Sequence, residues 1–144
     1  MPELIDIESQ TFSARDFRLE SGKTLPILEL AYETYGSLSA AGDNAILVVH
    51  GYTSSHHAAG RNAAGRQGRG VTEGSAGWFD GLIGPGKPID TDRYFVVSVN
   101  ALGSAHGSSG PNSIDPGTGK PYGPTFPEIT LCDMVASQKL LVDS

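Results

Sequence analysis

The residues best placed for chemistry follow a short apolar run, Ala45 to Val49, and are His50, Gly51 and Tyr52. An apolar run of this length is typical of a strand buried on both faces. Gly51, two residues after the run, lets the backbone turn sharply off the sheet. A backbone N–H in such a loop can donate to the negative charge that develops on a tetrahedral intermediate. The pattern therefore predicts an oxyanion-binding loop, with an ordinary strand end as the alternative.

No serine of the chain has the Gly-x-Ser-x-Gly spacing of a nucleophile on a strand-to-helix turn. The nearest is Ser109, in the stretch Gly107 to Pro111, but its second glycine is displaced and no buried strand enters it directly. The single cysteine, Cys132, lies beside a predicted helix start, where a thiol pKa can be lowered. Buried filler is the simpler interpretation of Cys132, so the sequence assigns no nucleophile.

The four histidines show none of the spacings of the usual zinc sites, so no metal is predicted. The adjacent pair His56 and His57 is interpreted as exposed polar filler on a loop. Residues 81–87 match the first seven positions of a phosphate-binding P-loop. Pro88 then stands where a serine or threonine must hold magnesium, so nucleotide binding is not predicted.

Two strand-like stretches lie before the apolar run. Residues 11–19 and 25–35 favour strands, and the turn signal at residues 21–23 joins them into a predicted hairpin. Alternation in the second strand predicts two faces. The more apolar face is predicted to hold Leu28, Leu30, Tyr32 and Thr34, and the other Ile27, Glu29, Ala31 and Glu33.

A crossover pattern comes after the hairpin. Residues 45–50 and 93–100 both favour buried strands, and residues 75–84 favour one short helix lying on the sheet. The last segment, residues 130–144, favours a helix that begins with a capping box of Thr130 and Asp133. Its apolar spacing is given by Met134, Val135, Gln138, Leu141 and Val142. Two buried strands joined by a crossover predict an α/β architecture.

Composition narrows the class of protein. The 144 residues carry a net charge of −6, which disfavours a nucleic-acid partner. One cysteine allows no internal disulfide and favours a reducing compartment. Residues 1–10 lack a signal-peptide pattern and are interpreted as an N-terminal tail, and no apolar run can span a membrane. A cytoplasmic protein is expected. The 19 glycines and 9 prolines indicate long loops, or part of something larger.

Four stretches of the chain resemble the N-terminal part of the homoserine O-acetyltransferase family, almost continuously from about Phe17 to Val142. The resemblance implies an α/β-hydrolase fold. It also implies transfer of an acetyl group from acetyl-CoA to the homoserine hydroxyl through an acyl-serine intermediate, in methionine synthesis. Acetyl-CoA would be a substrate, no cofactor would stay bound, and a homodimer is possible. The stretches are residues 28–36, 48–60, 77–123 and 126–143.

The resemblance also implies roles for individual residues. Tyr52 matches the family residue whose backbone N–H helps to hold the oxyanion, and Gly51, Thr53 and Asn100 are expected to bind substrate. The family loop reads roughly His-Ala-Leu-Thr-Gly where this chain has His-Gly-Tyr-Thr-Ser from His50 onward. A second departure replaces a family Gly-Cys by Ser-Ala in the loop after Asn100. These departures leave an esterase, or another O-acyltransferase of the same fold, open.

The triad of this fold comes in the chain order Ser, Asp, His. Its serine would follow the strand after the helix at 130–143. The resemblance thus implies that residues 11–144 are the N-terminal part of an α/β-hydrolase domain, truncated before the nucleophile. The chain alone is then not expected to catalyse the family reaction. A remaining alternative is a non-catalytic fragment that binds a partner through open sheet edges.

Overall fold

The computed structural model describes residues 3–4, 7–61 and 75–144. The chain forms two compact units: unit 1 is Met1–Gln10 with Tyr32–Val99, and unit 2 is Thr11–Ala31 with Asn100–Ser144. Across the described ranges, none of the helices has the length and apolar character that crossing a membrane requires.

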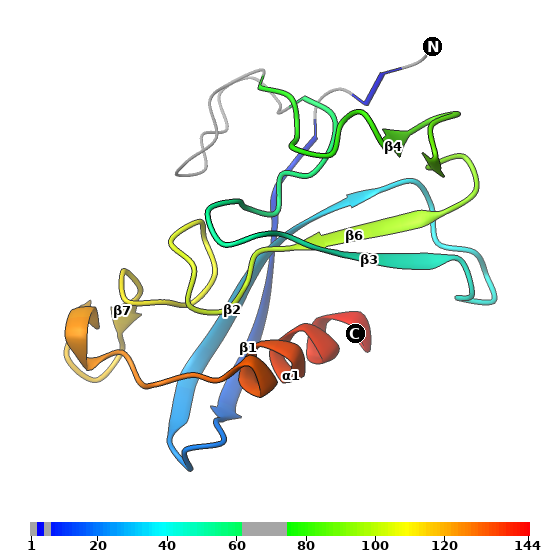
Figure 1. The fold of residues 1–144 in the computed structure, drawn as a ribbon. Coiled ribbons are helices and arrows are strands. Elements are labelled where there is room, and N and C mark those ends of the chain that lie inside the picture. Colours follow the sequence, from blue (N-terminus) through cyan, green and yellow to red (C-terminus); the bar gives the residue numbers. More distant parts are fainter. Residues whose placement is uncertain (1–2, 5–6, 62–74) are drawn as a thin grey trace. The chain divides into compact units, whose positions relative to one another are not determined.

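The sheet of unit 1 is organised around the strand β6 (Phe95–Val99). β6 pairs in parallel with β3 (Ala45–Val49), from Ala45 opposite Phe95 to Val49 opposite Val99. On its other side β6 pairs antiparallel with the end of β2 (Thr24–Tyr35). The strand order is β1-β2-β6-β3, with β1 at Gln10–Arg18 (Figure 1). The predicted hairpin and the predicted parallel pair are therefore both confirmed.

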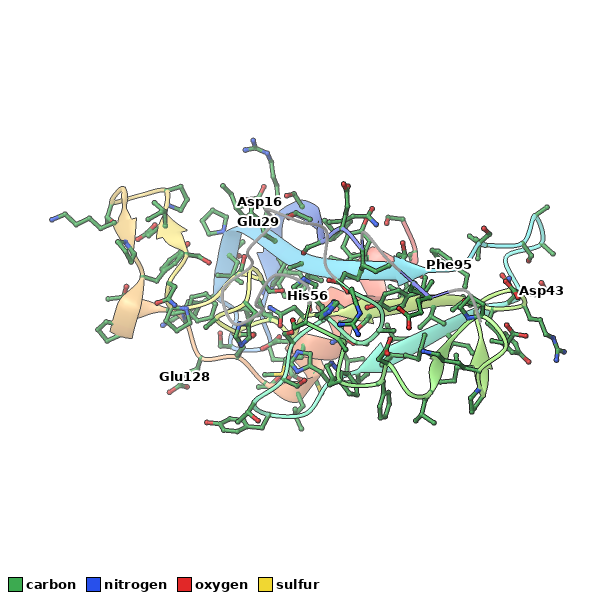
Figure 2. The ribbon with its side chains drawn as sticks, turned by 90° about the horizontal axis from the view of Figure 1, so that it is seen from above. Asp16, Glu29, Asp43, His56, Phe95 and Glu128 are labelled. Atoms are coloured by element: carbon green, nitrogen blue, oxygen red, sulfur yellow. The ribbon has the colours of Figure 1, made fainter. Side chains whose placement is uncertain are left out.

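The parallel register brings the beginnings of β3 and β6 to one end of the sheet. Asp43, in the turn before β3, and Phe95 lie at that end in Figure 2. The Phe95 N–H donates to the Asn44 carbonyl oxygen at 2.9 Å. The opposite, carboxyl ends of β3 and β6 carry His50 and Asn100. In open α/β sheets that end is where ligands bind.

The apolar sequence of β3 predicted a strand buried on both faces, but the structure does not show this. Leu47 and Val49 are exposed, and only Val48 of this strand is buried. The reason is position: β3 is the last strand in the sheet order, and among the described strands only β6 pairs with it. β6, between two neighbours, does bury Val96, Ser98 and Val99.

The predicted short helix at residues 75–84 is wrong. This part of the crossover consists of turns and two short parallel strands, β4 (Ile83–Gly84) and β5 (Ile89–Asp90). Gly77 explains the difference. A Cβ at Gly77 would meet the Ala58 and Ala59 backbone at 2.2 Å, so this segment follows a tertiary contact rather than its local helical pattern.

The core of unit 1 joins the sheet to the crossover. Leu4 and Ile7, in the segment interpreted as a tail, pack against this core, and Leu4 and Ile7 also bond to the Arg61 backbone at 3.0 Å. The buried members of the core are Tyr35, Val48, Ala58, Ala59, Ile83 and Val96.

Unit 2 holds the first part of the hairpin and the C-terminal segment. The hairpin turn is closed by the Leu19 N–H, which donates to the Lys23 carbonyl oxygen at 2.8 Å. The strands β7 (Ile114–Asp115) and β8 (Lys120–Pro121) pair antiparallel, and the 3-10 helix η1 (Gly123–Thr125) follows them. The chain then enters the helix α1 (Leu131–Val142).

The capping box of α1 is confirmed: Thr130 Oγ1 accepts from the Asp133 N–H, and the Asp133 carboxylate accepts from the Thr130 N–H. The predicted apolar face is partly wrong, because Val135 and Val142 are exposed. Asp133 is buried instead, since its carboxylate also accepts from the Glu20 N–H at 2.9 Å. The buried residues of α1 are Asp133, Ser137, Gln138 and Leu141.

The faces predicted for β2 hold only for its first half. Leu28 and Leu30 are buried as expected, but from Ala31 onward the buried positions are the odd ones. Glu33 is therefore buried, whereas Tyr32 and Thr34 are half-buried. The change of face coincides with the passage of β2 from unit 2 into unit 1.

The end of β2 requires a glycine. Gly36 has φ +80°, and a Cβ there would lie 2.3 Å from the Tyr94 carbonyl oxygen. We expect Gly36→Ala to lower the free energy of unfolding by more than about 3 kcal/mol, because the strained φ and a backbone clash add. Gly42→Ala is the control, with φ +68° but open space around the Cβ. It should lose only about 1–2 kcal/mol. Equal losses in urea unfolding would contradict the clash.

Candidate functional site

The loop after β3, residues 50–60 and called here the β3 loop, has an exposed first half. The Ser54 N–H closes a turn on the Gly51 carbonyl oxygen at 3.0 Å, and a ring nitrogen of His50 lies 2.8 Å from that same oxygen. Tyr52 is fully exposed, and Gly51 and Thr53 are exposed beside it. Among the described residues, no hydrogen bond engages the Tyr52 N–H. The predicted oxyanion donor is thus open to a ligand.

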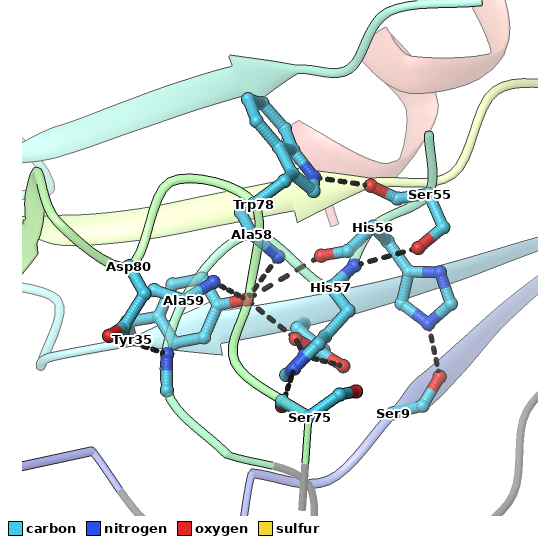
Figure 3. Close-up of polar contacts among 12 residues, drawn as sticks. Ser9, Tyr35, Ser55, His56, His57, Ala58, Ala59, Ser75, Trp78 and Asp80 are labelled. Carbon is cyan, nitrogen blue, oxygen red and sulfur yellow. Dashed lines mark hydrogen bonds and ion pairs between the residues drawn. The ribbon is translucent and has the colours of Figure 1, made fainter. Parts of the chain in front are cut away.

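The second half of the β3 loop, Ser55 to Gly60, is buried. Tyr35 of β2 lies against it (Figure 3). The Tyr35 hydroxyl accepts from the N–H groups of Ala58 at 3.0 Å and Ala59 at 3.1 Å. It donates to Glu33 Oε2 at 2.5 Å. Burial raises the pKa of Tyr35, and the charge and hydrogen bond of Glu33 raise it further against the two backbone donors. Tyr35 is therefore a neutral phenol.

His57 is the member of the β3 loop that faces Glu33. Its Nδ1 lies 3.0 Å and 3.2 Å from the two carboxylate oxygens, and its Nε2 lies 2.9 Å from the Ser75 carbonyl oxygen. Burial lowers the pKa of His57, but the hydrogen bonds to Glu33 and Ser75 and the charges of Glu33 and Asp80 outweigh it and raise this pKa. A carbonyl oxygen only accepts, so Nε2 carries a proton. Nδ1 faces the carboxylate, so protonated His57 and Glu33 form a buried ion pair, and the raised pKa of His57 favours that form.

The interpretation of His56 and His57 as exposed filler is wrong, since each side chain is 4% exposed. Nε2 of His56 lies 2.6 Å from the Ser9 hydroxyl (Figure 3). Sequence reasoning also missed Glu33 and Tyr35. The sequence placed Glu33 on the less apolar face of its strand, and nothing local links it to a histidine 24 positions away.

Asn100 begins the second loop, residues 100–110, directly after β6. Its side chain is fully buried, and its Oδ1 accepts from the Ser104 hydroxyl at 3.0 Å. Within the described part of the chain, Nδ2 of Asn100 has no hydrogen-bond partner. A buried amide without an acceptor is rare and indicates a group that the described residues do not supply.

Two serines of the second loop bond to the free edge of β2 in unit 2. Ser108 Oγ accepts from the Ala31 N–H at 3.0 Å and donates to the Asn100 carbonyl oxygen at 2.6 Å. Ser109 Oγ accepts from the Glu29 N–H at 2.8 Å, and the Ser109 N–H donates back to the Glu29 carbonyl oxygen at 2.7 Å. Both side chains are buried, so they replace a missing strand partner and are not placed to attack a substrate.

The two remaining candidates from the sequence are the thiol of Cys132 and a metal site. Cys132 is exposed on the first turn of α1, not buried as expected. No three His, Cys, Asp or Glu side chains gather into a possible metal site within the described ranges.

Comparison with curated proteins finds close relatives. The chain is 55% identical over 125 residues to a homoserine O-acetyltransferase of Moorella thermoacetica, which is 87% of this chain and 32% of the relative. It is 52% identical over 125 residues to a homoserine O-succinyltransferase of Pseudomonas putida, which is 87% of this chain and 31% of the relative. No protein-family model matches the chain. The chain spans about a third of the length of these relatives.

Solved structures give the fold. The homoserine O-acetyltransferase of Bacillus anthracis matches with a TM-score of 0.83 at 35% identity, covering 96% of this chain and 36% of that one. Esterase E22 matches with a TM-score of 0.82 at 38% identity, covering 95% of this chain and 37% of that one. The resemblance drawn from the sequence is confirmed, and the chain has the N-terminal portion of an α/β-hydrolase fold.

Replacing the Ser108 hydroxyl tests the serine contacts. We expect Ser108→Ala to lower the free energy of unfolding by about 1–3 kcal/mol, because the buried Ala31 N–H loses its acceptor. Ser37→Ala, at an exposed position, is the control and should change it by less than about 0.5 kcal/mol. Urea unfolding measures both. A loss for Ser108→Ala no larger than the control would contradict the assignment.

The raised pKa of His57 predicts how stability depends on pH. The ion pair contributes fully below the ordinary histidine value of 6.5, and its contribution is lost as pH rises through the raised value of the folded state. The free energy of unfolding should therefore fall from about pH 6.5 upward. His57→Gln cannot titrate and should flatten this dependence. An equal slope of the free energy of unfolding against pH in the wild type and in His57→Gln would contradict this prediction. The pKa values of Asp90 and Asp133 are lowered, so these two carboxylates affect the pH dependence of the free energy of unfolding only at acidic pH.

Proposed function

We propose that the chain forms the N-terminal part of a homoserine O-acyltransferase, which moves an acyl group from an acyl-CoA to the homoserine hydroxyl through an acyl-serine intermediate. One observation carries the proposal: identity of 55% over 87% of the chain with a protein of that name. Acetyl is the first acyl group to test, and a succinyl group is the alternative because relatives of both names match at similar identity. A cytoplasmic location agrees with this role.

In this proposal the β3 loop supplies oxyanion stabilisation. A tetrahedral intermediate places negative charge on the former carbonyl oxygen, and a fixed N–H donor lowers its energy. The exposed Tyr52 N–H serves as that donor, and Gly51 allows the turn that presents it. Thr53 lies beside it and is assigned to substrate binding.

Asn100 is assigned to substrate binding on different grounds. Its Nδ2 is buried and has no partner among the described residues, so a substrate group or a further segment of protein can accept from it. Its position after β6 fits the ligand-binding end of an α/β sheet.

The nucleophile, the acid and the base are not assigned to this chain. Its 144 residues contain no Gly-x-Ser-x-Gly stretch, and the relatives are about three times as long. The proposal places all three groups in the part of the relatives that this chain does not span, and the chain alone is proposed to be inactive.

The complete protein tests the proposal. We expect continued release of free CoA from acetyl-CoA to depend on added homoserine, because the acyl-enzyme turns over only when an acceptor hydroxyl takes the acyl group. A thiol reagent follows the CoA, and mass spectrometry identifies the O-acylhomoserine. Succinyl-CoA in a parallel reaction determines the acyl group. No acylated homoserine from either donor would contradict the proposal.

A second candidate is ester hydrolysis, favoured by the match to esterase E22 at 38% identity. Water then replaces homoserine as the acceptor of the acyl group. This candidate predicts equal acyl release with and without homoserine, and turnover of a simple acetyl ester such as p-nitrophenyl acetate. Hydrolysis that homoserine suppresses, with acylhomoserine formed instead, would favour the transferase.

A further inference from the structure

Glu33 is a carboxylate in the core of unit 1, with only 2% of its surface exposed. Its carboxylate accepts from the Tyr35 hydroxyl at 2.5 Å and lies 3.0 Å from Nδ1 of His57 in the β3 loop. A buried ion pair is weak evidence for stability, since apolar residues of similar volume often stabilise as much. A requirement for geometry is therefore the better explanation of this group.

The geometry that Glu33 serves is that of the β3 loop backbone. By accepting from Tyr35, Glu33 directs the phenol proton away from Ala58 and Ala59, so the phenol oxygen can accept from both N–H groups. Two consecutive backbone donors on one fixed oxygen determine the direction of the chain there. Gly77 further restricts the path of this backbone, because it lies too close to Ala58 and Ala59 to leave room for a Cβ.

The same half of the loop has two further attachments. His57 is held between Glu33 and the Ser75 carbonyl oxygen. Trp78 Nε1 donates to the Ser55 carbonyl oxygen at 2.9 Å. The stretch from His50 to Ser54 therefore runs between two fixed points, the end of β3 and Ser55, and contains the exposed Tyr52.

We propose that Glu33, Tyr35 and His57 are positioning residues: through the buried half of the β3 loop they set where the Tyr52 N–H points. The inference rests on the proposed function, in which that N–H holds the oxyanion. It assigns to these three side chains an effect on the rate of the chemical step while they touch no substrate. Small displacements of a donor are sufficient, because about 1 Å of misplacement can lower a rate by about 100-fold.

The test uses the complete protein and the variant Tyr35→Phe, which removes one hydroxyl and leaves the ring. We expect kcat to fall by about 10- to 100-fold, and KM to change by less than about threefold because no substrate contact is lost. Glu33→Gln is the second variant, expected to act in the same direction, and it serves if Tyr35→Phe fails to fold.

Two controls separate positioning from general loss of stability. Tyr32→Phe removes a hydroxyl from the same strand, where it makes one exposed bond of 3.2 Å to Gln10, and should leave kcat unchanged. Asp133→Ala removes the capping box of α1 and so destabilises unit 2, to which the β3 loop does not belong. A fall in kcat for Asp133→Ala as large as for Tyr35→Phe would overturn the inference.

Hydrogen exchange gives a readout that does not need activity. We expect the peptide spanning residues 50–60 to exchange at least about tenfold faster in Tyr35→Phe, whereas the peptide of α1 stays unchanged. Unchanged exchange at 50–60, or an unchanged kcat, would overturn the inference. If the wild-type complete protein transfers no acyl group, the proposed function fails. The positioning of the loop is then judged by exchange alone, so the two failures are distinguishable.

Discussion

The ion pair between Glu33 and His57 is the interaction on which the rest of unit 1 depends. A carboxylate inside a core is expensive unless charge and hydrogen bonds compensate it. Here the imidazole of His57 supplies the charge and the Tyr35 hydroxyl supplies a further donor. Because His57 belongs to the β3 loop and Glu33 to β2, compensation is possible only when the loop folds back over that strand. The burial of Glu33 therefore enforces one path for the loop.

The same path explains several backbone requirements nearby. Once Ala58 and Ala59 are fixed against Tyr35, the segment that packs over them must present backbone alone, and Gly77 meets this need. The segment then continues as turns that end in β4 and β5 rather than as a helix. In unit 2 the hydroxyls of Ser108 and Ser109 play a comparable part, since they complete the hydrogen bonding of β2 where no strand does.

Local patterns predicted what local chemistry determines. The hairpin, the strands at 45–49 and 95–99 and the capping box of α1 follow from alternation, apolar runs and cap residues within a few positions. The missed features depend on distant partners. Glu33 is buried because His57 neutralises it, and a histidine pair on a loop shows no local sign of that role. The exposure of Val49 likewise depends on which strands flank β3, which its own apolar sequence does not record.

In the proposed function, the β3 loop serves a step that acyl transfer and ester hydrolysis have in common. Acyl transfer and ester hydrolysis both pass through a tetrahedral intermediate, and both need the same fixed N–H donor for its oxyanion. A loop held by a buried ion pair suits either reaction, because oxyanion stabilisation does not depend on what attacks next. What separates the two reactions is whether water or a hydroxyl acceptor reaches the acyl-enzyme. The residues that choose the acceptor must therefore surround the nucleophile, and the departures at Tyr52 and Ser104 matter only if they reach that space.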